Sequence, residues 1–152
     1  MSERGPQSSP GFWLHHAALT WRQACEARLG DITYPQFNIL AAVSLLNDQG
    51  TPPTQQEAAD SARIDRKMAS KLVLTLTERN LLTRAADHSD ARLRRLHVTQ
   101  AGRDAVGRCV QAARQADQEV FGPDSDGIRE ALRMIAERRL PFALHHCAPE
   151  SP

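Results

Sequence analysis

Apolar side chains recur every three to four residues along most of the chain, and this spacing predicts helices. In residues 11–29 they fall on one side, which predicts an amphipathic first helix. Residues 37–46 are apolar nearly all round, so we expect a second helix that is buried on most sides. Thr33 caps this second helix, Gln36 is its capping-box partner, and Pro35 is tolerated in the first turn.

Residues 54–79 predict two short helices separated by a turn. Thr54 opens the first of them in a capping box with Glu57, where each side chain accepts a hydrogen bond from the other residue's backbone N–H. Two prolines directly upstream prevent an earlier helix from continuing into it. Residues 63–65 form the turn, and Asp65 can cap the second helix.

The second of these helices has an apolar side and a polar side at helical spacing. The predicted inward residues are Met68, Ala69, Leu72, Val73 and Leu76. The predicted outward residues of the first turns are Arg66, Lys67, Ser70 and Lys71. Short polar side chains can reach base edges and cations can meet phosphates, so this side suits a reader of the DNA major groove. Leu74 also lies outward, and the pattern gives no reason for it.

A β-hairpin is predicted after these helices. Asn80 stands where a left-handed backbone ends the second helix, a conformation that Asn tolerates. One strand begins at Leu81 and Leu82, and the other covers residues 92–98, with residues 87–90 as the tip. Two helices followed by such a hairpin predict a mainly α protein with a winged helix-turn-helix and a two-stranded β-wing.

Two more helices are predicted after the hairpin. Thr99 caps a long helix over residues 100–121, and residues 122–124 end it. A last helix runs from about residue 126 to about residue 140, where Pro141 ends or kinks it. The residues in line on this last helix are Ile128, Leu132, Ile135 and Arg139.

Helices with narrow apolar stripes at both chain ends suit an intersubunit bundle, although they could also simply close the core of a monomer. Dimerisation is favoured because a single winged helix contacts too few base pairs to recognise an operator specifically. We therefore expect one domain over residues 11–147, after a disordered tail at residues 1–10 that is rich in Ser, Pro and Gly. Within the domain, residues 33–99 form the DNA-binding core, and residues 11–30 and 100–147 form dimerisation helices.

Composition and charge narrow the class of protein further. A chain of 152 residues with few aromatic residues suits a single, mainly helical domain. No apolar run has membrane-spanning length, residues 1–10 lack the apolar core of a signal peptide, and three widely spaced cysteines suit a reducing cytoplasm. Residues 63–103 hold ten Lys or Arg against four Asp or Glu, whereas the remainder holds nine against fourteen. A solvated surface could carry the same charge, but together with the helix-turn-helix pattern this positive region indicates DNA binding.

Five motifs, in this order and at these separations, resemble the MarR family of bacterial winged-helix regulators. They are TQQEAA, DRKMASKLV, LTERNLLTR, the D-x-R pattern at Asp90 and Arg92, and HVTQAGR. The stretch ITYPQFNILAAVSLL resembles that family's second helix, and the similarity covers about residues 12–122. The resemblance implies a homodimer formed by the first, fifth and sixth helices. It also implies a repressor that binds a pseudo-palindromic operator and is released by a small-molecule effector, often an aromatic acid.

The residues expected to bind DNA come from three parts of the winged helix. At the start of its first helix, for the DNA backbone, they are Thr54, Gln55 and Gln56. On the recognition helix, for the major groove, they are Arg66, Lys67, Ser70 and Lys71. On the wing, for phosphates or the minor groove, they are Arg84, Arg92, Arg94 and Arg95. The resemblance implies that Asp90 holds Arg92 in place, whereas Ala91 departs from the Arg that many relatives carry.

The residues expected to line an effector site are His15, Trp21, Tyr34 and Phe37. Trp21 and Phe37 could equally be plain core residues. Redox sensing by Cys25 is an alternative that resembles a peroxide-sensing branch of the family, but the place of Cys25 on an apolar stripe favours core packing. The clusters His15–His16 and His145–Cys147 are poor chelators, because adjacent helical residues point about 100° apart, so we expect no metal site.

An enzyme is a rival class of function. The chain lacks the nucleophile-elbow, zinc-protease, phosphate-loop, dinucleotide-binding and C-x-x-C motifs, and its carboxylates stand at helix starts and on exposed faces, where capping accounts for them. We therefore expect neither an enzyme nor a cofactor. A third class is a winged helix whose basic face binds an acidic protein, and such a module would ignore DNA sequence.

Overall fold

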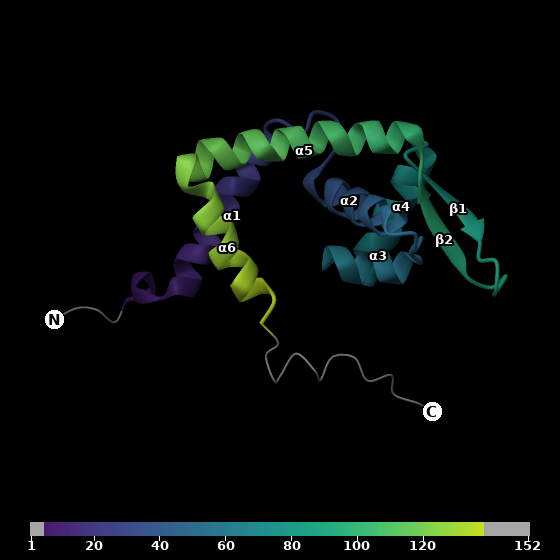
Figure 1. Cartoon of the computed structure of the whole chain (residues 1–152), viewed down its shortest axis with the longest axis horizontal. Coiled ribbons are helices and arrows are strands. Elements are labelled where there is room, and N and C mark those ends of the chain that lie inside the picture. Colours follow the sequence, from purple (N-terminus) through teal and green to yellow (C-terminus); the bar gives the residue numbers. More distant parts are fainter. Residues whose placement is uncertain (1–4, 139–152) are drawn as a thin grey trace, which may run out of the picture.

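The computed structural model of this protein describes residues 5–138 and has the predicted mainly α winged helix-turn-helix fold (Figure 1). In chain order the helices are α1 (Pro10–Glu26), α2 (Tyr34–Asp48), α3 (Gln55–Ala62), α4 (Arg66–Glu78), α5 (Gln100–Phe121) and α6 (Ser125–Ala136). The antiparallel strands β1 (Leu82–Ala86) and β2 (Arg94–Val98) form the wing between α4 and α5. Short 3-10 turns occupy Pro6–Ser8 and Gly122–Asp124.

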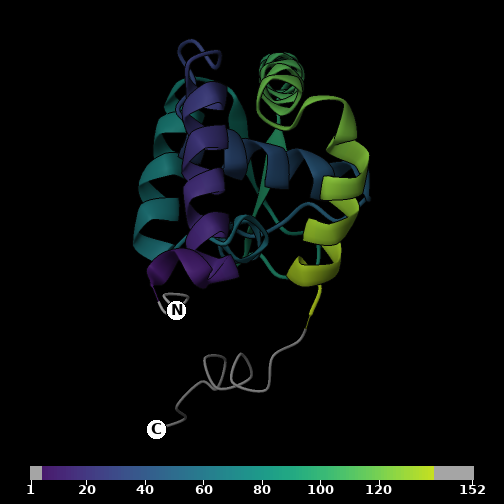
Figure 2. The same ribbon diagram turned by 90° about the vertical axis from the view of Figure 1, so that its left-hand side faces the viewer.

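The long helix α5 joins two parts of the molecule. Figure 1 shows α1 and α6 at one end of α5, and α2, α3, α4 and the wing at the other. In the view along α5, α1 and α6 extend from it on opposite sides (Figure 2). The part that carries the predicted DNA-binding residues is therefore separate from the part that carries both terminal helices.

Local capping fixes where the helices of the winged part begin. Both predicted capping boxes are present: Thr33 accepts from the backbone N–H of Gln36 at 3.3 Å, and Thr54 accepts from that of Glu57 at 3.2 Å. The Asp65 side chain accepts from a backbone N–H in the first turn of α4 at 3.0 Å. Each cap satisfies a backbone donor that the helix leaves unpaired, which is why these helices start at the predicted residues.

Helix α2 lies at the centre of the winged part, as its nearly continuous apolar sequence predicted. Its side chains Ile39, Leu40 and Val43 are fully buried. Further fully buried large side chains come from α4 and the wing, among them Val73, Leu76, Leu82 and Leu96. Burying one such side chain contributes about 1.5–3 kcal/mol, so these contacts hold α4 and the wing on a common core.

The wing is attached to the helices through the backbone of β2. Within the hairpin, Leu82 is opposite Val98, and the register continues to the wing tip. The backbone N–H of Leu96 donates to the carbonyl of Pro53 at 2.7 Å, and an isolated bridge joins Arg95 to Thr54. Because of these contacts, the base of the wing is fixed to the start of α3.

Some boundaries differ from the sequence predictions. Pro6–Ser8 forms a turn and α1 begins at Pro10, where a disordered tail was expected, because proline fixes a backbone angle close to the helical value. The last described helix ends at Ala136. The residues of the sequence predictions that lie outside the described range are Arg139, Leu140, Pro141 and His145–Cys147. Within residues 5–138, no helix has both the length and the apolarity to cross a membrane.

Candidate nucleic-acid interface

Helix α4 presents a polar side to solvent, as predicted. Its residues Ala69, Val73 and Leu76 are fully buried and fix the opposite side against the core. The exposed polar residues of its first turns are Arg66, Lys67, Ser70 and Lys71. Among residues 5–138 no hydrogen bond or ion pair engages these four side chains, so they are available to a partner. Met68 differs from the prediction: it lies at the edge of the apolar stripe and is 46% exposed.

A cleft of about 380 Å³ lies between the wing and the starts of α3 and α4. The predicted DNA-binding residues that line it are Thr54, Gln55, Gln56, Arg66, Arg92 and Arg94. Residues from α3, α4 and the wing thus converge on one cleft, and three of these residues are arginines. A concave surface with this charge attracts and orients phosphate groups.

The polar residues at the start of α3 have structural partners as well. The Gln55 side chain accepts from the guanidinium of Arg84 on β1 at 3.0 Å, and Gln56 donates to Asp60 at 2.7 Å. The Thr54 hydroxyl is used in the capping box. These side chains therefore hold the rim of the cleft, and Arg84 links the wing to α3.

Asp90 contacts Arg92 through the backbone of the wing turn. A carboxylate oxygen of Asp90 accepts from the backbone N–H of Arg92 at 2.9 Å, and no ion pair between these two side chains is present among the described residues. Asp90 therefore fixes the backbone of the turn. The side chains of Arg92 and Arg94 are exposed and line the cleft.

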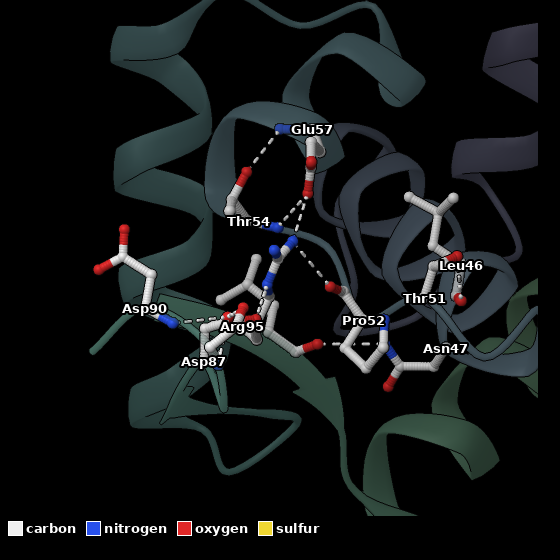
Figure 3. A network of polar contacts seen from close by, with 11 residues as sticks. Leu46, Asn47, Thr51, Pro52, Thr54, Glu57, Asp87, Asp90 and Arg95 are labelled. Atoms are coloured by element: carbon white, nitrogen blue, oxygen red, sulfur yellow. Dashed lines mark hydrogen bonds and ion pairs between the residues drawn. The ribbon is translucent and has the colours of Figure 1, made fainter. Parts of the chain in front are cut away.

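Arg95 has a different environment from the neighbouring wing arginines. Its Nε donates to Asp87 at 2.7 Å, and its Nη1 donates to Glu57 at 2.9 Å and to the carbonyl of Pro52 at 3.3 Å (Figure 3). The side chain is only 26% exposed. Arg95 was expected to contact DNA; in the free protein its Nε and Nη1 donate to groups of the protein itself.

The electrostatics of Asp87 are set by its hydrogen-bond donors. The hydroxyl of Ser89, the guanidinium of Arg95, and the backbone N–H groups of Ser89 and Asp90 hold the pKa of the Asp87 carboxyl far below its usual range. The hydrogen bond to Asp87 in turn raises the pKa of Arg95. Since charged hydrogen bonds favour the ionised forms, this pair stays ionised at neutral pH and well into the acid range.

The structure brings together some of the residues predicted for an effector site. The rings of Trp21 and Tyr34 pack edge to face at 5.8 Å, and the Arg22 guanidinium lies 5.2 Å from the centre of the Tyr34 ring. Phe37 is buried in the core, whereas His15 is exposed and lies beside His16. The four residues therefore do not line one cavity.

A larger cavity of about 810 Å³ lies between α1, the end of α5 and α6. Its walls are mainly apolar, with Trp21 as the member of the predicted effector set that reaches it. The Trp21 indole donates to Asp117 on α5 at 2.7 Å. Sequence analysis missed Asp117, because nothing in helical spacing connects residues that lie 96 positions apart. It also missed Arg22, which neighbours Trp21 in the chain and contacts the ring of Tyr34 on the next helix.

The cysteines within the described residues are poor candidates for redox chemistry. Cys25 and Cys109 are free and buried. Burial is the main cause that raises the pKa of each thiol. A raised pKa keeps the less reactive thiol form, so Cys25 has the properties of a core residue. No group of three or more potential metal ligands is found in residues 5–138.

Comparison with known proteins places this geometry in context. No family model matches the sequence. A relative in Bacillus subtilis is YdcH, described as an uncharacterized HTH-type transcriptional regulator, which is 29% identical over 77% of this chain and 81% of its own length. The solved structure of BpsR from Bordetella bronchiseptica, whose DNA binding is regulated by 6-hydroxynicotinic acid, is 24% identical with a TM-score of 0.77. The match covers 91% of this chain and 100% of the BpsR chain.

Two further solved structures share the architecture. CouR from Rhodococcus jostii RHA1, a transcriptional repressor solved on a 23-mer DNA duplex, is 26% identical with a TM-score of 0.72 over 90% of this chain and 99% of its own. A MarR-family regulator from Rhodococcus sp. RHA1 is 21% identical with a TM-score of 0.77 over 88% of this chain and 96% of its own. By its fold the chain is therefore a winged helix-turn-helix protein that is similar to MarR-family regulators, as the sequence resemblance predicted.

Proposed function

We propose that this protein is a homodimeric transcriptional repressor of the bacterial cytoplasm, which binds a pseudo-palindromic operator and is released by a small aromatic acid. The observation that carries the DNA-binding part is the arginine-lined cleft beside the exposed polar side of α4. Cations from α4 and the wing converge there with polar residues from α3. This is the combination that phosphate contacts and base contacts together require.

In this proposal, α4 and the wing contact different parts of the DNA. The exposed residues Lys67, Ser70 and Lys71 on α4 enter the major groove, where they read base edges. Arg92 and Arg94 on the wing contact phosphates or the adjacent minor groove. CouR, a repressor solved on duplex DNA, has the same fold over nearly its whole length, which supports this mode.

The homodimer is supported by apolar residues that the single chain leaves in water. The large exposed apolar residues of the terminal helices include Trp13, Leu14, Met134 and Ile135. The cavity between α1 and α6 is also mainly apolar. Because contiguous exposed apolar surface marks an interaction site, we assign α1, α6 and the adjoining end of α5 to dimerisation, and residues 33–99 to DNA binding.

The proposed effector is a small aromatic acid. BpsR, whose DNA binding is regulated by 6-hydroxynicotinic acid, suggests an aromatic acid as the first compound to test. The neighbouring Trp21, Tyr34 and Arg22 offer ring faces and a cation to such a molecule. A change in tryptophan fluorescence upon addition of 6-hydroxynicotinate, absent in Trp21→Phe, would place the acid near this cluster.

The test of DNA binding is a fluorescence anisotropy titration with the intergenic duplex upstream of the protein's own gene, at several salt concentrations. We expect tight binding at two chains per site that weakens steeply with salt, and much weaker binding to a scrambled duplex.

Lys71→Ala should reduce the preference for the specific duplex, whereas Arg92→Ala should weaken binding to both duplexes. Equal, weak binding to both duplexes by protein free of small molecules would instead favour a module that binds an acidic protein.

A further inference from the structure

We infer that Arg95, held between Asp87 and Glu57, is a positioning residue that fixes the tip of the wing relative to α3 before DNA is bound. This inference rests on the proposed function. In this role Arg95 does not touch DNA itself. It holds in place Arg92 and Arg94, the exposed wing residues that line the cleft. This role also explains two carboxylates on a surface that otherwise gathers positive charge.

The geometry of the guanidinium carries the inference. One edge of Arg95 donates to Asp87, which directly follows β1, and the other donates to Glu57 and Pro52 at the start of α3 (Figure 3). The planar fork of arginine fixes the directions of these bonds. A single side chain thus connects the wing tip to the helix that carries the rim of the cleft.

Asp87 also accepts hydrogen bonds from residues in the turn of the wing. Its second carboxylate oxygen accepts from the backbone N–H groups of Ser89 and Asp90 at 3.0 and 3.1 Å, and from the Ser89 hydroxyl at 2.6 Å. Asp90 in turn accepts from the backbone of Arg92. The contacts therefore run without a break from α3 through Arg95 to the residue that is expected to touch DNA.

Glu57 joins the same network to the capping box of α3. One of its carboxylate oxygens accepts both from the backbone N–H of Thr54, at 2.7 Å, and from Arg95. The base of the wing is already fixed through the backbone of Leu96. The hydrogen bond from Arg84 to Gln55 is another contact between the wing and α3. Arg95 adds an attachment that reaches Asp87 at the tip, which restricts how the hairpin can tilt.

The charges argue against a direct role for these groups on DNA. Asp87 and Glu57 lower the positive potential beside the cleft, so by electrostatics alone they weaken DNA binding. A site that is held in its binding geometry loses less conformational entropy when its ligand arrives. We therefore expect the gain from holding the wing in place to exceed the repulsion from the two carboxylates.

Glu57→Gln separates the two effects. Glutamine retains the capping box, because its side-chain oxygen can accept from the backbone of Thr54, but it replaces the ion pair with Arg95 by a weaker, uncharged hydrogen bond. Electrostatics alone predicts tighter DNA binding by this variant, whereas a positioning role predicts binding about two- to fivefold weaker. The matched control is Glu78→Gln on the exposed end of α4, which should bind DNA equally or more tightly. Tighter binding by Glu57→Gln than by wild type would overturn the inference.

Arg95 itself distinguishes positioning from phosphate contact. Arg95→Lys keeps the charge but cannot bridge Asp87 and Glu57 with a fork, so we expect it to bind as weakly as Arg95→Ala. Unchanged thermal stability would show that the loss is local. If Arg95 contacted a phosphate instead, the Lys variant would keep most of the affinity, and the Ala variant would reduce the salt slope by about one.

Hydrogen exchange tests the inference without DNA. In wild type, the backbone N–H groups of Ser89 and Asp90 are hydrogen-bonded to Asp87. Glu57→Gln should increase their exchange several-fold, whereas Glu78→Gln should leave it unchanged. Wild-type protein that fails to bind operator DNA would contradict the proposed function, while unchanged exchange in Glu57→Gln would contradict the positioning role.

Discussion

Gly102 lies where the first turn of α5 packs against the start of the wing. A Cβ atom at this position would be 2.1 Å from the carbonyl oxygen of Leu81 and 2.8 Å from a methyl group of Val98. The backbone N–H of Gly102 also donates to the hydroxyl of the capping residue Thr99 at 2.9 Å. Only glycine lets α5 approach the wing this closely.

Gly102→Ala should therefore destabilise the protein by about 1–3 kcal/mol, because the backbone of Leu81 cannot move aside as a flexible side chain could. Gly107 lies in the same helix with open space around its Cα, so Gly107→Ala should stabilise the protein by up to about 1 kcal/mol. Thermal or urea unfolding of the two variants checks this. Equal stability of both would mean that α5 does not pack on the wing in this way.

Leu74 is an apolar residue on the outward side of α4 that the residue pattern did not explain. It is 55% exposed, and its helical spacing places it with Lys67 and Lys71 on the outward side of α4. If that side enters the major groove, an apolar side chain there can contact the methyl group of a thymine. Leu74 would then contribute to the choice of bases.

This predicts a measurable dependence on thymine methyl groups. Wild-type protein should bind the operator duplex more tightly than the same duplex with uracil in place of thymine, by about fourfold for one methyl contact worth roughly 0.8 kcal/mol. Leu74→Ala should lose this preference, while Leu45→Ala, at an exposed leucine of α2, should keep it. A full preference in Leu74→Ala would exclude the contact.

Asp65 is the N-terminal capping residue of α4, the helix expected to enter the major groove. Its side chain caps α4 beside the residues expected in the groove. Asp65→Ala should cost about 0.5–2 kcal/mol in stability and should weaken DNA binding, although it removes a negative charge. Asp65→Asn keeps a capping oxygen and serves as the control in the same unfolding and anisotropy measurements. Tighter binding by the Ala variant would mean that charge, not the cap, dominates at this position.

The elements that could be predicted depend on contacts within a few residues. The capping residues Thr33, Thr54 and Asp65 find their partners three residues later, so their sequence pattern is sufficient. The second strand begins later than predicted, at Arg94, because the backbone N–H of Leu93 donates to the carbonyl of Asp90 and closes a turn. Turn geometry of this kind overrides strand propensity without changing the pattern of residue types.

Contacts between distant residues could not be predicted from the sequence. Arg95 and Glu57 are 38 positions apart, and the indole of Trp21 meets a carboxylate 96 positions later. Periodicity shows which side of an element is buried, but not which element covers it. Arg95 therefore looked like the other wing arginines, and its partners became visible only once β2 was placed beside α3.

Both ends of the molecule are tied to α5. Trp21 on α1 donates to Asp117 near the end of α5, and Arg103 near its start pairs with Asp48 on α2 at 2.7 Å. The recognition helix is thus held at a defined position relative to α1 and α6. In a dimer formed by these terminal helices, the distance between the two recognition helices would be set by the protein, and a two-fold operator needs half-sites one helical turn, about 34–36 Å, apart.

Breaking the dimer should consequently abolish operator binding without unfolding the winged part. Ile135 on α6 is 52% exposed in the single chain, so Ile135→Glu should leave the chain folded and shift it to monomers in analytical ultracentrifugation. Affinity for the full operator should fall by about 100-fold or more, because each half-site is then bound without the effective concentration that the partner supplies. Leu45→Glu changes a leucine of similar exposure, 56%, on α2 and should remain dimeric. An Ile135→Glu protein that is dimeric and binds the operator as wild type does would assign the dimer interface, and with it the half-site spacing, to another surface of the chain.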